Sequence, residues 1–250
     1  MFSPNSQSQI TTLLFDCDNT LVLSEELAFE ACAELANEIL ATHSISDRYT
    51  GPQLMSEFVG QNFRGMMVSL QRKYGIQLSP NDLETYVLRE EDQVIAKLKE
   101  KLQPCTGVDL ELAKLFQKKT YKMAVVSSSA LRRVKASVEK VGQDQYFHPN
   151  NIFSAATSLP KPTSKPDPAI YLHAMEVLGV QPSECVAIED SRSGTLSAVR
   201  AKIPVVGYVG SYEPEKVEEM SKVLTDAGAM VLMTDWSQFE KCLEEIEKST

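Results

Sequence analysis

The fold is decided near the start of the chain, where the apolar run Ile10-Thr-Thr-Leu-Leu-Phe15 passes directly into Asp16-Cys-Asp-Asn-Thr20. A short, β-prone run of this kind is typical of a strand that is buried on both faces of a parallel sheet. The acidic residues that follow it then lie at the carboxyl end of the strand, where open α/β sheets place their functional groups. The sequence therefore predicts an α/β fold with a site that begins at Asp16.

Downstream of Pro104, short apolar runs alternate with amphipathic stretches. The apolar runs predict strands at 122–127, 151–154, 185–189, 203–208 and 229–233, and the amphipathic stretches predict helices at 108–119, 130–141, 168–179, 194–201, 213–226 and 235–248. This alternation specifies a doubly wound, Rossmann-like parallel sheet with helices on both faces. Right-handed crossovers bring the carboxyl ends of all the strands to one edge of such a sheet.

Between the first strand and Pro104 the pattern is helical. Apolar residues recur at helical spacing from Leu27 to Ile39 and again from Leu83 to Leu98, and charged residues occupy the other faces. We therefore predict a small, all-helical cap domain that is inserted after the first strand. The predicted domains are a tail at 1–9, a core formed by 10–23 and 102–250, and the cap at 24–101.

Composition and charge narrow the class of protein. Of the 250 residues, 25 are Lys or Arg and 34 are Asp or Glu, which gives a net charge of −9. Nucleic-acid surfaces and anionic membranes attract clustered positive charge, so neither is an expected partner. No apolar run approaches the roughly 18 residues of a membrane span. The polar start is expected to be a disordered tail and lacks a secretory signal pattern. Five cysteines without a CxxC pair indicate reduced thiols. We expect a cytoplasmic monomer.

Polar groups follow three predicted strands. Asp16 and Asp18 are close enough to favour a divalent cation with oxygen ligands, such as Mg²⁺. The strand at 122–127 ends in a run of serines, and hydroxyl groups at the start of a helix suit a phosphate oxygen. The strand at 185–189 ends in the acid pair Glu189 and Asp190, and Lys165 lies in the proline-rich loop 158–168. All four elements are expected at one edge of the sheet.

Each of these features also has an ordinary structural explanation. The aspartates could form a solvated turn, the serines could cap a helix, and the acid pair could complement a helix dipole. Lys165 could be a solvated loop lysine, as Lys161 could be. The coincidence of four such elements at one edge favours a functional site over four independent explanations.

In this order the segments resemble the motifs of the haloacid dehalogenase-like hydrolase superfamily, in the subgroup of β-phosphoglucomutase and small-molecule phosphatases with a helical cap. The matching residues are Phe15-Asp-Cys-Asp-Asn-Thr-Leu21, Ser127 after Val125-Val126, Lys165 in Lys-Pro-Asp-Pro168, and Ile188-Glu-Asp-Ser191. The resemblance covers residues 10–248. It implies that Asp16 is the nucleophile, which forms an aspartyl-phosphate, and that Asp18 is the acid/base.

The resemblance also implies ligands for a metal and for the substrate. Mg²⁺ would be held by the Asp16 side chain, the Asp18 backbone carbonyl and Asp190, with Glu189 as a further ligand or as a support for the ligands. The candidate residues for holding phosphate or substrate are Ser127, Ser128, Lys165 and, in the cap, Arg64. Arg64 belongs to the segment 58–65, which resembles the specificity loop of this subgroup.

The predicted function is Mg²⁺-dependent hydrolysis of a small phosphorylated metabolite, a sugar or polyol monophosphate. A phosphomutase of the β-phosphoglucomutase type is the enzymatic alternative. That enzyme has a cap histidine twelve residues beyond its nucleophile, where an ungapped count gives Ala28 here, which favours the phosphatase. A dehalogenase is disfavoured by Asp18, because displacing a halide needs no acid at that place. A catalytically idle binding module that keeps the fold is disfavoured by the complete set of motifs.

Overall fold

The computed structural model describes residues 9–58 and 61–249. The chain divides into two compact units, one that runs up to Leu23 and resumes at Pro104, and another from Ser24 to Gln103. Of the tail expected at 1–9, residues 1–8 lie outside the described part.

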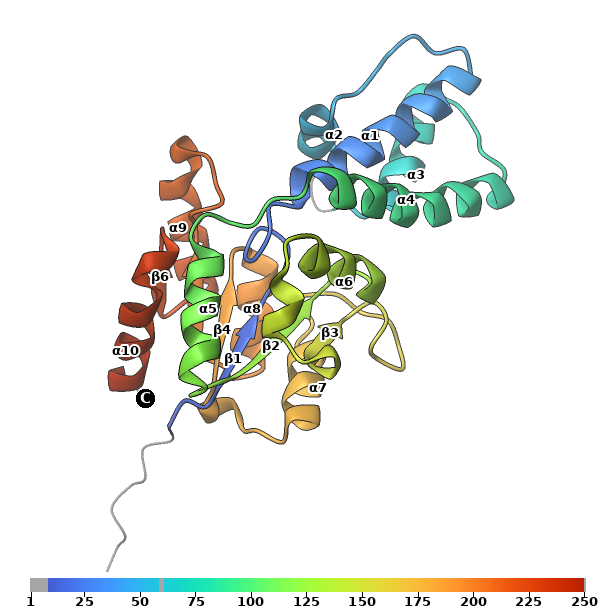
Figure 1. Cartoon of the computed structure of the whole chain (residues 1–250). Coiled ribbons are helices and arrows are strands. Elements are labelled where there is room, and N and C mark those ends of the chain that lie inside the picture. Colours follow the sequence, from blue (N-terminus) through green and yellow to red (C-terminus); the bar gives the residue numbers. More distant parts are fainter. Residues whose placement is uncertain (1–8, 59–60, 250) are drawn as a thin grey trace, which may run out of the picture. The chain divides into compact units, whose positions relative to one another are not determined.

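The first unit is built on a parallel sheet whose strands lie in the order β3-β2-β1-β4-β5-β6 (Figure 1). The strands are β1 (Thr12–Phe15), β2 (Lys122–Ser127), β3 (Ile152–Ser154), β4 (Cys185–Glu189), β5 (Val205–Tyr208) and β6 (Val231–Met233). All pairings in the sheet are parallel, so the predicted doubly wound α/β fold is confirmed. Strand β5 begins later than expected, because Ile203 N–H donates to Ala198 O at the end of a helix and Pro204 has no N–H to donate.

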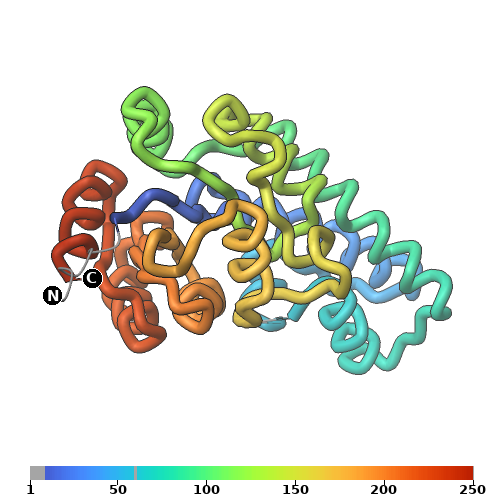
Figure 2. The backbone as a smooth tube through the Cα atoms, turned by 90° about the horizontal axis from the view of Figure 1, so that it is seen from below, coloured from blue at the N-terminus to red at the C-terminus, as the bar shows by residue number. Residues whose placement is uncertain are grey.

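Helices alternate with these strands. They are α5 (Val108–Lys118), α6 (Leu131–Lys140), α7 (Ala169–Leu178), α8 (Arg192–Arg200), α9 (Pro214–Ala227) and α10 (Phe239–Ser249). Figure 2 shows α5 and α6, in green and yellow-green, over one face of the sheet and α7 and α8, in gold and orange, over the other. This is the layering that right-handed crossovers in both directions from β1 produce.

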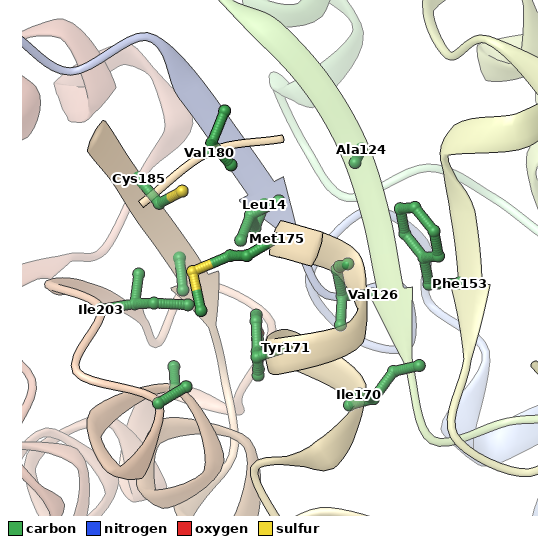
Figure 3. Close-up of a cluster of buried hydrophobic side chains, with 14 of the residues drawn as sticks. Leu14, Ala124, Val126, Phe153, Ile170, Tyr171, Met175, Val180, Cys185 and Ile203 are labelled. Carbon is green, nitrogen blue, oxygen red and sulfur yellow. The ribbon is translucent and has the colours of Figure 1, made fainter. Parts of the chain in front are cut away.

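Both faces of the sheet are buried, as the apolar runs predict. On one face, Leu14 of β1 and Val126 of β2 pack with Tyr171 of α7 in a single apolar cluster (Figure 3). On the other face, the ring of Phe15 lies 6.2 Å from that of Trp236. Since β1 lies at the centre of the sheet and is covered on both sides, the residues that follow it are held by a rigid support.

The second unit is helical in its described residues. Its helices are α1 (Glu25–Thr42), α2 (Gly51–Glu57), α3 (Phe63–Tyr74) and α4 (Pro80–Lys101). Buried apolar residues of α1 and α3, such as Leu35, Ile39 and Met67, form one cluster inside this unit. Across the described parts of both units, no helix has the length and apolar character needed to cross a membrane.

Candidate active site

The register of the sheet brings acidic side chains together. Phe15 of β1 pairs with Ile188 of β4, and the Asp16 N–H donates to the Ile188 carbonyl at 3.0 Å. Asp16 and Glu189 are therefore neighbours at the carboxyl ends of adjacent strands. Carboxylate oxygens of Asp16, Glu189 and Asp190 all lie within 4.8 Å of one another, and the three residues are buried. Buried carboxylates at this spacing repel one another unless cations compensate them.

Lys165 supplies one of these cations from the loop between β3 and α7. Its Nζ lies 2.5 Å from Asp16 Oδ1 and 2.6 Å from Glu189 Oε1, and it donates to the Val126 carbonyl at 2.7 Å. Only 3% of the Lys165 side chain is exposed. Lys161, the other lysine of this loop, is exposed. The structure thus distinguishes the two lysines, each of which precedes a proline, by the burial of one and the exposure of the other.

The electrostatics of the cluster follow from burial and from the close charges. The pKa of Asp16 is raised to about 7, chiefly by burial and also by the charges of Glu189 and Asp18, while Lys165 acts to lower it. For Lys165, burial acts to lower the pKa, but the carboxylates of Asp16 and Glu189 outweigh burial and raise it. Lys165 is therefore cationic at neutral pH, whereas Asp16 without a metal is near the balance between acid and carboxylate.

Glu189 is held from two sides. The hydroxyl of Tyr171 on α7 donates to Glu189 Oε1 at 2.5 Å. On the other side lies Gly194 of α8, where an added Cβ would be 1.7 Å from Glu189 Oε2. Among the described residues, Oε2 is buried and has no hydrogen-bond partner. A buried carboxylate oxygen without a partner fits a place in the coordination sphere of a cation.

The residues present fit Mg²⁺. Asp16, Glu189 and Asp190 offer hard oxygen donors, the ligand type that Mg²⁺ prefers. Thr20 Oγ1 donates to Asp190 Oδ1 at 3.3 Å and so orients that carboxylate. The Asp18 side chain lies outside this group, and its expected contribution through the backbone carbonyl stays a prediction.

Asp18 lies in a more open position than Asp16. Ser129 Oγ donates to Asp18 Oδ2 at 2.6 Å, and Arg133 Nη2 on α6 donates to Asp18 Oδ1 at 3.2 Å. The Asp18 side chain is 27% exposed and that of Arg133 is 18% exposed. The next residue, Asn19, has a left-handed backbone with φ of 57°, a conformation that Asn tolerates better than most residues.

The predicted serines lie at the end of β2. Ser127 is fully buried, and its Oγ accepts a hydrogen bond from Ser129 N–H at 3.0 Å. Ser128 Oγ accepts from the Lys165 N–H at 3.1 Å and so ties the lysine loop to β2. Both hydroxyls thus shape the backbone around the site, and their contact with phosphate stays a prediction.

Arg64 lies in the helical unit, near the start of α3. Its guanidinium forms a paired hydrogen bond with the carboxylate of Glu84 on α4. Of the segment 58–65, which was expected to be a specificity loop, residues 59 and 60 lie outside the described part. Asn62 caps α3 by accepting a hydrogen bond from Gly65 N–H. A role for Arg64 in substrate binding stays a prediction.

Three residues of the site were not identified from the sequence. The sequence predicts no separate role for Ser129, although its position beside Ser127 and Ser128 is a signal for one. Arg133 and Tyr171 lie inside amphipathic helices, where nothing local distinguishes them from surface and core residues. Their roles depend on where α6 and α7 cross the edge of the sheet.

The arrangement suits chemistry on an anionic group. A buried carboxylate lies beside a fixed ammonium group and two further carboxylates that suit a divalent cation, and a more exposed acid lies nearby. Positive groups that are already in place stabilise charge that develops during group transfer without further reorganisation. Transfer of a phosphoryl group depends mostly on this kind of positioning and charge neutralisation.

Comparison with known proteins agrees with a site for phosphoryl transfer. A family model for haloacid dehalogenase-like hydrolases matches residues 10–202. The 6-phosphogluconate phosphatase of Escherichia coli is 29% identical over 206 residues, which cover 79% of this chain and 82% of the relative. A phosphorylated carbohydrates phosphatase of Thermotoga maritima is 29% identical over 222 residues, which cover 88% of this chain and 93% of the relative.

Solved structures include relatives with the same fold. A Thermotoga maritima protein assigned as a β-phosphoglucomutase superposes with a TM-score of 0.71 at 27% identity, covering 94% of this chain and 99% of that one.

Proposed function

The chain belongs to the haloacid dehalogenase-like hydrolase family and is a phosphatase, and we propose that it hydrolyses a small sugar or polyol monophosphate with the help of Mg²⁺. The observation that carries this proposal is the buried group of Asp16, Lys165, Glu189 and Asp190 at the carboxyl edge of the sheet. The relatives named for 6-phosphogluconate and phosphorylated carbohydrates support a small phosphorylated substrate.

In the first half of the reaction, a carboxylate oxygen of Asp16 attacks phosphorus. A new bond forms between this oxygen and phosphorus, and the bond between phosphorus and the ester oxygen breaks. Asp18 gives its proton to the departing ester oxygen, which leaves as an alcohol, and an aspartyl-phosphate remains. Lys165 stabilises the negative charge on the phosphoryl oxygens, a role that its raised pKa allows at neutral pH.

In the second half, the Asp18 carboxylate takes a proton from water as the water oxygen attacks the aspartyl-phosphate. The bond between phosphorus and the Asp16 oxygen breaks, which restores both aspartates and releases inorganic phosphate. The partly exposed position of Asp18 suits a group that must meet both the leaving alcohol and water. When bound to Asp16, Asp190 and Glu189, Mg²⁺ would neutralise charge on the phosphoryl group.

The test is phosphate release from a panel of sugar, polyol and glycerol monophosphates, with and without Mg²⁺. We expect Mg²⁺-dependent release that is concentrated on a few esters, and no release by the Asp16→Asn variant. The absence of release from every ester would contradict the proposal. The panel includes β-glucose 1-phosphate with a coupled assay for glucose 6-phosphate.

That assay addresses a second candidate, a sugar phosphomutase, which the structural likeness to an assigned β-phosphoglucomutase favours. Ala28, a buried residue of α1, lies twelve residues beyond Asp16, where an ungapped count places the cap histidine of β-phosphoglucomutase. Formation of glucose 6-phosphate without net phosphate release would contradict the proposed phosphatase function and favour a mutase.

A further inference from the structure

The Asp18 carboxylate is held by donors at both of its oxygens. Ser129 Oγ donates to Oδ2 at 2.6 Å, and Arg133 Nη2 donates to Oδ1 at 3.2 Å. The terminal torsion of an aspartate side chain is soft, so contacts rather than intrinsic preference fix the plane of its carboxylate. Of these two donors, Ser129 is the closer and has the shorter side chain. The direction in which Asp18 presents its oxygens therefore depends on how firmly Ser129 is held.

The backbone of Ser129 is held by hydroxyl groups at the ends of two strands. Ser127 Oγ, at the end of β2, accepts from the Ser129 N–H at 3.0 Å, and Ser154 Oγ, at the end of β3, donates to the Ser129 carbonyl at 2.7 Å. Ser127 and Ser154 are fully buried and are partners in the register of β2 and β3. The two peptide groups on either side of the Ser129 side chain are thus tied to neighbouring strands of the sheet.

Ser154 is held in turn by Thr157. The Thr157 N–H and Oγ1 donate to Ser154 Oγ at 3.1 and 2.8 Å, which leaves the hydroxyl hydrogen of Ser154 for the Ser129 carbonyl. Thr157 Oγ1 also accepts from the N–H of Leu131, the first residue of α6, at 3.1 Å. Linked hydrogen bonds polarise and strengthen one another. The chain of hydroxyl groups therefore fixes Ser129 from the end of β3.

We propose that Ser129 is the positioning residue of the general acid/base. Its hydroxyl holds the Asp18 carboxylate in the orientation from which Asp18 gives its proton to the leaving oxygen, and Ser154 acts through Ser129 by holding its backbone. A misplacement of about 1 Å in a reacting group can cost a hundredfold in rate, so this support matters for turnover. The inference rests on the proposed phosphatase function of Asp18 and adds two residues that act through Asp18.

Two esters that differ in their need for a proton test the proposal in the full chain with Mg²⁺. Phenyl phosphate and p-nitrophenyl phosphate carry the same phosphoryl group, but nitrophenolate leaves readily as an anion, whereas phenolate gains more from protonation. The constant kcat/KM covers the steps up to departure of the leaving group and so omits hydrolysis of the aspartyl-phosphate. We expect Ser129→Ala to lower kcat/KM for phenyl phosphate by about tenfold to a hundredfold, and for p-nitrophenyl phosphate much less.

Related variants assign this change in the ratio of the two kcat/KM values. Ser129→Thr keeps the hydroxyl and should keep the wild-type ratio. Ser154→Ala should change the ratio in the same direction as Ser129→Ala, but by a smaller factor. The matched control is Ser137→Ala on α6, which should leave the ratio unchanged. Ser137 is also fully buried, and its Oγ has no hydrogen-bond partner among the described residues.

A double variant tests whether Ser129 acts through Asp18. Asp18→Asn removes the acid and sets the limit of the change in the ratio. Residues that act as one unit are not additive, so Asp18→Asn combined with Ser129→Ala should have the same ratio as Asp18→Asn alone. A further change in the double variant would show that Ser129 acts on another group and would overturn the inference.

The outcomes separate this inference from the function on which it rests. If Ser129→Ala lowers kcat/KM for both esters by the same factor, Ser129 contacts the phosphoryl group or only supports the fold, and the inference is wrong. The ratio does not depend on the fraction of active protein, so partial unfolding does not imitate the expected result. If neither these esters nor the sugar panel releases phosphate, the phosphatase function itself fails. If Ser129→Ala does not fold, Ser154→Ala decides, because it leaves the Ser129 hydroxyl present.

Discussion

The ammonium group of Lys165 lies 2.5 Å from Asp16 Oδ1, so a loop beyond the third strand is joined to the end of the first by a buried ion pair. The pair makes the two residues interdependent. Lys165 keeps its proton because carboxylates surround it, and the ionised form of Asp16 is stabilised mainly by Lys165. Removing one partner of a buried pair leaves the other charge uncompensated, which costs far more than the loss of a surface ion pair.

The first prediction concerns the two lysines of the loop. Lys165→Ala should lower the free energy of unfolding by about 3–5 kcal/mol and abolish phosphate release, because Asp16 and Glu189 lose their common cation. The exposed Lys161 is the matched control, and Lys161→Ala should change stability by less than about 0.5 kcal/mol and leave activity intact. Denaturant unfolding and phosphate release measure both effects. Equal losses in the two variants would show that the wrong lysine has been assigned.

The second prediction concerns the pH dependence of Mg²⁺ binding. The pKa of Asp16 without metal is raised to about 7, chiefly by burial, so below this pH the metal must displace a proton. The apparent affinity should therefore fall by about tenfold for each pH unit below 7 and level off above it. Calorimetric titration at pH 6, 7 and 8, in buffers of different ionisation enthalpy, measures the affinity and the protons released. An affinity that is constant across this range would contradict the role of Asp16 as a ligand.

The third prediction separates the chemistry of Asp16 from its structural role. Asp16→Asn should abolish turnover, since an amide cannot replace the carboxylate nucleophile, but the chain should fold because Lys165 keeps Glu189 as its partner. The control is Asp226→Asn, at an exposed position on α9, which should retain full activity. Circular dichroism and thermal melting report folding. Substantial Mg²⁺-dependent turnover in purified Asp16→Asn would show that another residue is the nucleophile.

The parallel sheet and the functional residues at the ends of its strands could be predicted from the sequence. Asp16 and Glu189 follow apolar runs that are buried on both faces, and such runs are hard to accommodate outside a parallel sheet. Because parallel strands align their carboxyl ends, the pattern predicts that both residues lie at one edge of the sheet, and the structure adds that β1 and β4 are neighbours there. The choice of Lys165 over Lys161 came from the family resemblance, and the structure supplies its physical reason, the burial of one lysine against exposure of the other.

The site residues that lie inside helices could not be predicted, because their positions depend on packing between helices and the sheet that the local sequence does not encode. Tyr171 occupies a core-facing position of α7, where any large apolar side chain would satisfy the amphipathic pattern. Its contact with Glu189 is set by where α7 crosses the sheet. Arg133 and Arg132 are adjacent on α6 and indistinguishable by type, and only the orientation of the helix brings the former to Asp18.

The fourth prediction concerns Tyr171, which positions Glu189 without touching the reacting atoms. Tyr171→Phe removes the hydroxyl that donates to Glu189 Oε1 but keeps the ring in the core. We expect a loss of about 1–3 kcal/mol in stability, because a hydrogen bond to a buried carboxylate is lost, together with weaker Mg²⁺ binding. Tyr146 is a partly buried tyrosine whose ring packs against Phe116 of α5, and Tyr146→Phe is the control that should leave Mg²⁺ binding unchanged. If Tyr171→Phe lowers stability but leaves Mg²⁺ affinity unaltered, Tyr171 is structural only.

The fifth prediction tests the contact between α8 and Glu189. Gly194 leaves no room for a side chain, since a Cβ there would lie 1.7 Å from Glu189 Oε2 and 2.3 Å from its carboxyl carbon. Gly194→Ala should therefore displace the Glu189 carboxylate, lower stability by about 1–3 kcal/mol and weaken Mg²⁺ binding and turnover together. A change of backbone conformation is not the cause, because Gly194 lies in the first turn of α8 with no positive φ.

The same substitution at a helical glycine that has room for a Cβ gives the control for stability. Gly65 also lies in a helix, α3, and a Cβ there would approach its nearest neighbours only to 3.4 Å, an ordinary contact. Gly65→Ala should raise stability by about 0.5–1 kcal/mol, because alanine loses less backbone entropy than glycine when a helix forms. If Gly194→Ala lowers the free energy of unfolding and Gly65→Ala raises it, the loss in Gly194→Ala comes from its contact with Glu189. A stable Gly194→Ala protein with wild-type Mg²⁺ affinity would mean that the Glu189 carboxylate is free to move and is not needed where the structure places it.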